Sequence, residues 1–150
     1  MGGRFRFRCD KRGRGAENWR AGYTGRVHSR FNSFSLQDTL SQGSDLLEVP
    51  GVRLLESSRN RIGEIFLSSP EAARNPCILK EFRPRGIDKL KSALIRTKAC
   101  KAWRGSWALV EAGVDTPLPI AYLEKWKGIL LDHALCFALS VADAPELRVL

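Results

Sequence analysis

Long hydrophobic runs are missing from this sequence. The best apolar stretches in its 150 residues, Ile129–Leu131 and Ala134–Leu139, have only the length of strands. A transmembrane helix needs roughly 18 or more consecutive apolar residues. The basic N-terminus also lacks the apolar segment of a secretory signal. We therefore expect no membrane-spanning helix and a cytoplasmic protein.

Cysteine and histidine are scarce, and their spacing does not suit a metal site. The two histidines are His28 and His133, and there is no CxxC pair, so no zinc-binding pattern is present. The four cysteines are Cys9, Cys77, Cys100 and Cys136. We interpret the last three as small buried hydrophobic residues and Cys9 as an exposed thiol. No metal ligands are predicted.

Acidic residues are rare at the N-terminus, where most of the positive charge is found. The formal net charge is +9, and residues 1–30 hold nine Arg or Lys against Asp10 and Glu17, a net of +7. The remaining 120 residues therefore carry only +2. Residues 1–44 are rich in Gly, Arg, Ser and Asn without regular periodicity, which predicts a mostly flexible basic tail.

This basic tail is a candidate surface for binding polyanions. Its first cationic residues are Arg4, Arg6, Arg8, Lys11, Arg12 and Arg14. Aromatic residues stand among the arginines, as in segments that lie on an anionic membrane surface or stack on nucleic-acid bases. We weigh the membrane surface above nucleic acid, and a solvated extension without a ligand remains the alternative.

Regular hydrophobic patterning begins near residue 45. Short apolar runs between polar loops predict three strands that pair as an antiparallel meander. Apolar residues spaced three to five apart then predict a helix, re-phased near its possible cap Thr97 and ended by Gly113. The expected elements are strands at 52–55, 62–67 and 77–82, a helix at 87–110, and strands at 120–123 and 129–139, with a turn at 124–128. The order β-β-β-α-β-β predicts an α+β domain with a five-stranded antiparallel sheet and one main helix.

Several motifs of this region resemble those of one known family. They are Leu54-Leu-Glu-Ser-Ser-Arg-Asn-Arg61, Ile78-Leu-Lys-Glu-Phe82 followed by Arg83-Pro84, and Thr97-Lys-Ala-Cys-Lys-Ala-Trp-Arg104. The last resembles the helix motif S/T-K-A-R-x-x-W, and Ala112-Gly-Val-Asp-Thr-Pro-Leu-Pro119 follows it in place of aGipTPrP. The stretch from Leu46 to about Val141 thus resembles the amino-terminal lobe of the lipopolysaccharide (Kdo/heptose) kinases, which have a protein-kinase-like fold.

The resemblance implies a nucleotide site. In that fold a lysine on the third strand contacts the ATP phosphates, and the loop between the first two strands covers them. Lys80 stands at the lysine position, although an isolated strand lysine is more often a solvated residue. The other residues expected at ATP are Ser57, Ser58, Arg59 and Asn60 in the loop, and Ser140 and Ala142 at the hinge. Complete members would use ATP and Mg²⁺ to phosphorylate a lipid-linked sugar at the inner face of a membrane.

Two departures concern the lysine and the loop. The loop has no GxGxxG motif, and Gly63 is the only glycine nearby. The fold normally pairs the lysine with a helix glutamate, but no Glu lies between Asp88 and Val110, and Ala102 stands at the aligned position. Lys80 is therefore either held by another group or vestigial.

Catalytic residues are absent from the sequence. No Asn follows Lys80, and neither an HxD-like nor a DFG-like triplet occurs. His133 beside Asp132 is interpreted as a solvated turn pair and not as a general base. We divide the chain into the tail (1–44), a kinase-like lobe (45–142) and the start of a hinge or second-lobe helix (143–150). We expect a truncated protein that is inactive alone.

Two functions remain open at this stage. The first is a truncated lipopolysaccharide-kinase-like protein, cytoplasmic or peripheral at the inner membrane. The second is a non-catalytic interaction protein whose basic tail binds an anionic membrane surface or nucleic acid. Without a second lobe, we expect one face of the last strand to stay partly uncovered, either Leu135, Phe137 and Leu139 or Cys136 and Ala138.

Overall fold

The computed structural model describes residues 17–18, 22–28, 46–48, 52–56, 60–66 and 76–140, and these form one sheet with helices beside it. The strands are β1 (Glu17–Asn18), β2 (Tyr23–Val27), β3 (Arg53–Glu56), β4 (Arg61–Ile65), β5 (Cys77–Phe82), β6 (Pro119–Lys127) and β7 (Leu130–Leu139). The helices are α2 (Ile87–Leu94) and α3 (Lys98–Glu111). None of the helices in this part of the chain is long and apolar enough to cross a membrane.

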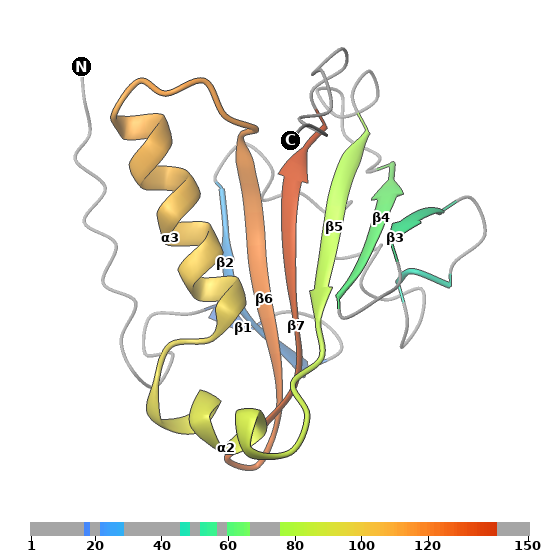
Figure 1. Cartoon of the computed structure of the whole chain (residues 1–150), viewed down its shortest axis with the longest axis vertical. Coiled ribbons are helices and arrows are strands. Elements are labelled where there is room, and N and C mark those ends of the chain that lie inside the picture. The colour runs from blue at the N-terminus through green and yellow to red at the C-terminus, as the bar shows by residue number, and fades with distance from the viewer. Residues whose placement is uncertain are drawn as a thin grey trace, which may run out of the picture.

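The sheet is antiparallel throughout and has the strand order β1-β2-β6-β7-β5-β4-β3. The meander β3–β4–β5 occupies one side of it, the hairpin β6–β7 lies in the middle, and β2 pairs with β6 on the other side (Figure 1). The predicted α+β class is therefore confirmed. The sheet has seven strands among the described residues and not the predicted five, because the N-terminal segment adds β1 and β2.

Strand β2 lies within the segment that was predicted as a flexible tail. Its first residue, Tyr23, is only 2% exposed and packs in the hydrophobic core. Gly25 approaches β6 so closely that a Cβ there would lie 2.0 Å from the carbonyl oxygen of Tyr122. Tyr, Thr and Val of the sequence YTGRV favour a strand, but Gly25 interrupts the pattern within an arginine-rich segment, so pairing with β6 determines this strand.

The turn between β6 and β7 lies later in the chain than most of the expected turn at 124–128. Strand β6 continues through this segment to Lys127, and the chain turns at Gly128, whose φ is +62°. The polar residues in the segment Glu124 to Lys127 suggested a loop. On the strand, however, their side chains form a hydrogen bond or an ion pair or remain partly exposed. The turn therefore falls where a glycine accepts a left-handed backbone.

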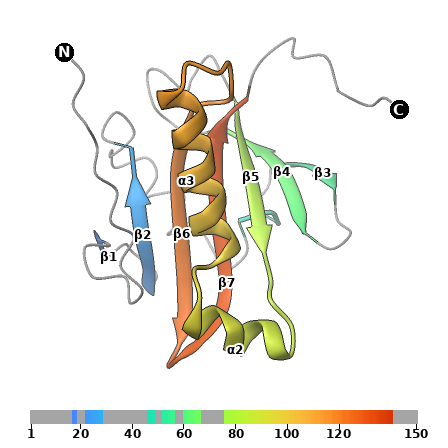
Figure 2. The same ribbon diagram turned by 60° about the vertical axis from the view of Figure 1, so that its left-hand side comes forward.

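The predicted helix is divided in two at the point where its period changes. Thr97 is the N-cap of α3, and its hydroxyl oxygen accepts a hydrogen bond from the backbone N–H of Cys100 at 3.1 Å. The predicted cap is thus confirmed. Helix α3 lies across β6 and β7, whereas the shorter α2 lies at the end of the sheet next to the β6–β7 turn (Figure 2).

Two hydrophobic clusters hold these layers together, and β7 contributes to both. Leu135 and Phe137 belong to a cluster with Tyr23, Leu79 and neighbouring strand residues. Leu131 and Ala134 belong to a second cluster that contains Trp103 of α3. Alternate residues of a strand face opposite sides of the sheet, and the register shift between the pairs Lys125–His133 and Trp126–Leu131 brings Leu131 to the side of Ala134, which explains how one strand supplies both clusters.

We predict that Gly25→Ala destabilises the protein by about 3 kcal/mol, because the new methyl group would displace β2 from the backbone of β6. The free energy of unfolding, measured in urea, tests this. Gly105→Ala is the matched control: Gly105 lies in α3 with nothing within 4 Å of an added Cβ. That control should stabilise by about 0.5–1 kcal/mol. Equal stability of Gly25→Ala and the parent protein would show that β2 is not held as described.

Candidate functional site

Lys80 lies on the third strand of the meander, β5, between two neighbouring strands. Its register partners are Ile62 on β4 and Cys136 on β7. Its Nζ atom is 5.3 Å from the ring centre of Phe82. Within the described part of the chain, Lys80 makes no ion pair, in line with the absence of a glutamate from the aligned position of α3.

The Cys136 thiol beside Lys80 is chemically quiet. Burial raises the pKa of this thiol to about 11, and the charge of Lys80 only partly opposes the increase. A thiol with so high a pKa stays protonated at neutral pH and is a poor nucleophile. Cys136 is therefore not suited to covalent chemistry, and the side chains of this region are better suited to binding.

The face of the sheet around Lys80 is only half-buried. Ile78, Lys80, Cys136 and Ala138 are all partly exposed, whereas their sequence neighbours Leu79 and Phe137 have no exposed surface. We call these four residues the Lys80 strip. Of the two alternatives for the partly uncovered face of β7, the structure agrees with Cys136 and Ala138, since Leu135 and Phe137 are buried; Leu139 at the strand end is also partly exposed.

The residues expected at the hinge and the loop lie at opposite ends of the Lys80 strip. Asn60 precedes Arg61, which pairs with Glu81 near the end of β5. Ser140 follows Leu139 at the start of β5, and its backbone N–H donates to the carbonyl of Pro76 at 2.7 Å. The other expected residues, Ser57, Ser58, Arg59, Ala142 and the tail cations, lie outside the described residues.

A buried ion-pair network that the sequence did not reveal anchors the strands next to Lys80. The Glu81 side chain is 4% exposed, and Arg61 donates to its Oε2 from Nε at 2.9 Å and from Nη2 at 2.5 Å. Arg83 donates to Oε1 at 2.5 Å. Both carboxylate oxygens thus accept hydrogen bonds from cationic side chains, which a buried charge needs in order to be stable. Since successive residues of a strand alternate, Glu81 points away from the face that carries Lys80.

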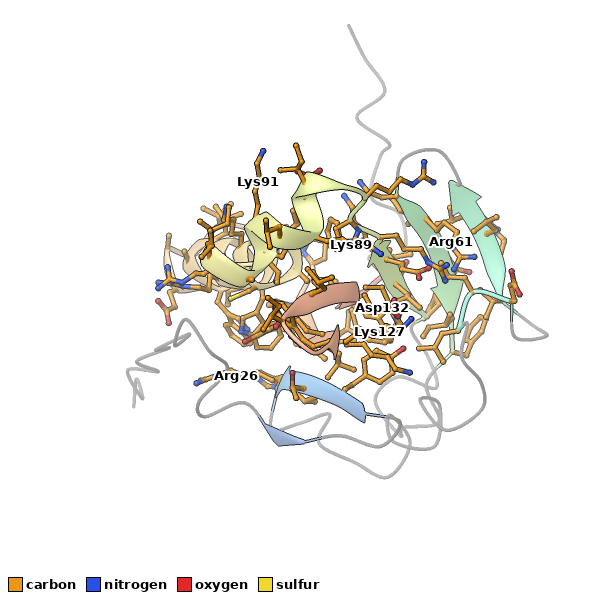
Figure 3. The ribbon with its side chains drawn as sticks, turned by 90° about the horizontal axis from the view of Figure 1, so that it is seen from below. Arg26, Arg61, Lys89, Lys91, Lys127 and Asp132 are labelled. Carbon is orange, nitrogen blue, oxygen red and sulfur yellow. The ribbon has the colours of Figure 1, made fainter. Side chains whose placement is uncertain are left out.

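Beside this end of β5 lies a cavity of about 380 Å³ that we call the cationic cavity. It is formed by the β5–α2 loop, α2, the start of α3 and part of β7, and Asn60 also lines it. Its basic residues are Arg83, Arg85, Lys91, Arg96, Lys98 and Lys101, against a single acidic residue, Asp88. Figure 3, seen from this end of the molecule, shows Lys91 on α2 and Arg61 on β4. Sequence analysis missed the cavity because its cations come from separate elements and form no continuous motif.

His133 is buried and not part of a solvated turn, so that interpretation is wrong. It lies on β7 with 7% exposure, and its Nε2 is 2.7 Å from the hydroxyl of Tyr23 on β2. Its Nδ1 lies 3.0 Å from a carboxylate oxygen of Asp132. A hydrogen bond from Lys127 lowers the pKa of Asp132 and is the largest cause of that shift. The chain Tyr23–His133–Asp132 links β2 to the central hairpin.

Glu124 connects the start of α3 to the sheet. It accepts hydrogen bonds from the Thr97 hydroxyl and, at 3.2 Å, from the indole Nε1 of Trp126. Burial raises the pKa of Glu124 despite these two hydrogen bonds, which favour the charged carboxylate. The helix cap and the strand therefore share one partly desolvated carboxylate.

In the part of the chain that the structure describes, the side chains that could bind a metal do not form a site for a divalent cation. No three His, Cys, Asp or Glu side chains come together there to hold a metal ion. Cys77 and Cys136 form no disulfide, but Cys100 is disulfide-bonded, which corrects its interpretation as a simple buried hydrophobic residue.

Comparison with known proteins gives no relative for this arrangement. No protein-family model, no curated protein and no solved structure matches the chain. The function must therefore be argued from the residues themselves.

We predict a pH dependence of stability that depends on Glu124. Because its pKa is higher in the folded state than the ordinary value, its contribution to stability is complete below pH 4.5 and is lost as the pH rises through the raised pKa. The free energy of unfolding of the parent relative to Glu124→Gln should fall over this range and then level off. A difference that is constant or grows with pH would contradict this.

Proposed function

We propose that residues 46–140 form a protein-kinase-like amino-terminal lobe related to the lipopolysaccharide kinases, and that the Lys80 strip is its nucleotide-facing surface. In this proposal Lys80 contacts the phosphates of ATP, and members of that family transfer a phosphate to a lipid-linked sugar. The observation that carries the proposal is the place of Lys80 on the third strand of the meander, on the partly exposed face of the sheet.

The order of the elements supports the same proposal. The chain runs through the meander β3–β4–β5, then α2 and α3, and then the hairpin β6–β7. A helical segment inserted after the third of five strands is the layout that the resemblance implies. Asn60 before β4 and Ser140 after β7 lie at opposite ends of the strip, as residues of a phosphate-covering loop and a hinge would.

No catalytic step is assigned to this chain. The described residues offer no group of carboxylates for Mg²⁺, and the sequence lacks the catalytic triplets of the family fold. What the chain's own residues supply is a cation at the strip and an apolar surface from Ile78 and Ala138 beside it. Binding of nucleotide by the chain alone is therefore expected to be weak.

Weak nucleotide binding at Lys80 can be detected with a covalent probe. ATP oxidised at its ribose to the 2′,3′-dialdehyde condenses with a nearby lysine amine, releasing water, and borohydride reduces the imine to a stable amine. Peptide mass spectrometry should find Lys80 labelled, and excess MgATP should protect it.

The exposed Lys127 is the matched control, since it lies on the β6–β7 hairpin and should be labelled without protection. Lys80→Ala should remove the protected product. Labelling of Lys80 that MgATP does not reduce would contradict the nucleotide role of the strip. Protection confined to Lys98 and Lys101 would place the nucleotide in the cationic cavity and also contradict it.

The basic N-terminus supports an alternative function, that of a non-catalytic protein held at an anionic surface. In that case the proposed location is the inner face of the membrane. The structure changes how this is tested, because β2 belongs to the sheet and deleting residues 1–30 would remove it. Replacing the six tail cations at positions 4, 6, 8, 11, 12 and 14 by Gln leaves the sheet residues intact.

The tail variant should lose most of its co-sedimentation with phosphatidylserine vesicles at low salt. Binding of the parent should weaken as salt rises, because the screening length falls from about 30 Å at 0.01 M to about 8 Å at 0.15 M. A matched variant with Arg53→Gln and Lys127→Gln changes charges on the sheet and should bind like the parent. Undiminished binding by the tail variant would refute the assignment to the tail.

A further inference from the structure

We propose that the cationic cavity is a binding site for a small organic phosphate. The ligand class is a phosphate monoester with a compact apolar or planar group attached. This site is distinct from the Lys80 strip and does not depend on the nucleotide role proposed for it, because Lys80 does not line the cavity.

The size of the cavity selects a small molecule. Its volume of about 380 Å³ lies at the lower end of the range of roughly 300–1,000 Å³ that is usual for ligand pockets. A folded protein domain or a nucleic-acid duplex cannot enter such a space, whereas a phosphate with one ring or a short chain can.

Three of the six cations that line the cavity make no ion pair among the described residues. Arg83 is paired with Glu81, and Lys91 lies 3.9 Å from Asp88. Among the described residues, Arg85, Lys98 and Lys101 make no ion pair. Several cations gathered without counter-ions repel each other, and a bound anion would relieve that repulsion.

The start of α3 increases this positive potential. The first turn contains Lys98 and Lys101 and no acidic residue. Cations are normally unfavourable there, because the helix dipole places partial positive charge at the N-terminus. The two lysines are three residues apart and therefore lie on the same side of the helix, where both can approach one phosphate. Together with the other cations that line the cavity, this arrangement favours a dianion.

The remaining walls suit the organic part of the ligand. Phe82, Leu131 and Ala134 are buried and line the cavity, and Ile95 lines it with 55% of its surface exposed. The hydroxyl of Ser92 already donates to the carbonyl of Asp88, at 2.8 Å. Of these residues only Ile95 exposes much apolar surface to water, so an attached apolar group that covers it should increase affinity over inorganic phosphate.

The test titrates the full chain with phenyl phosphate and inorganic phosphate and follows backbone amides by ¹H–¹⁵N spectroscopy. We expect saturable shifts among residues 83–101, with tighter binding of phenyl phosphate. Lys98→Gln with Lys101→Gln should weaken binding about tenfold. Arg85→Gln removes a positive charge that lies in the β5–α2 loop. Its effect on binding therefore does not depend on the stability of α3.

Matched variants separate this site from general charge and from the Lys80 strip. Arg53→Gln with Lys127→Gln removes two positive charges elsewhere and should change affinity less than about twofold, as should Lys80→Ala. Ile95→Thr should weaken phenyl phosphate binding but leave inorganic phosphate unchanged. Shifts that spread over the cationic surface without saturation, or unchanged affinity in both cavity variants, would overturn the proposal.

Vesicles distinguish a lipid headgroup from a soluble phosphate as the source. In the background of the neutral tail, binding to phosphatidylcholine vesicles containing phosphatidic acid is compared with and without the two lysine substitutions. A loss with Lys98→Gln and Lys101→Gln supports the site and assigns a lipid source. Loss of phenyl phosphate binding alone supports the site and assigns a soluble source.

Discussion

The two-sided burial of β7 is the constraint on which the rest of the structure depends. This strand pairs with β6 along one edge and with β5 along the other, and its alternate residues enter both hydrophobic clusters. A slip of one residue would exchange its two faces, so the register is strongly determined. That register places Cys136 beside Lys80 and His133 within reach of Tyr23. The exposure of the Lys80 strip and the attachment of β2 follow from it.

The placement of the helices then separates the two regions that we propose for binding. Helix α3 covers β6 and β7 but leaves the β4–β5 side of the same face partly open. The short α2 and the start of α3 line the cationic cavity at the end of the sheet. The Lys80 strip offers one cation on a broad half-buried surface, whereas the cavity offers several exposed cations around a hollow. Phe82 belongs to both regions, since its ring lies under the Nζ of Lys80 and lines the cavity.

The sequence predicted the parts of the fold whose signals are local. Short apolar runs of strand length predicted the meander, and the cap residue Thr97 predicted the start of α3. Strand β2 was missed because its hydrophobic signal is weak and its stability comes from close pairing at Gly25. The extent of β6 was missed because Glu124 finds partners only in the folded chain. Lys80 could be placed on its strand from the sequence, but the cationic cavity could not, since Arg85, Lys91 and Lys101 meet only through tertiary packing.

The central claim is that nucleotide contacts the partly exposed face of β5 and β7 around Lys80. The most direct measurement is a ¹H–¹⁵N spectrum of the full chain titrated with magnesium and a non-hydrolysable ATP analogue. The account predicts shifts at the amides of Ile62, Ile78, Lys80 and Cys136, which are reduced in Lys80→Ala. Shifts confined to residues 83–101, or to the opposite face of the sheet, would contradict it.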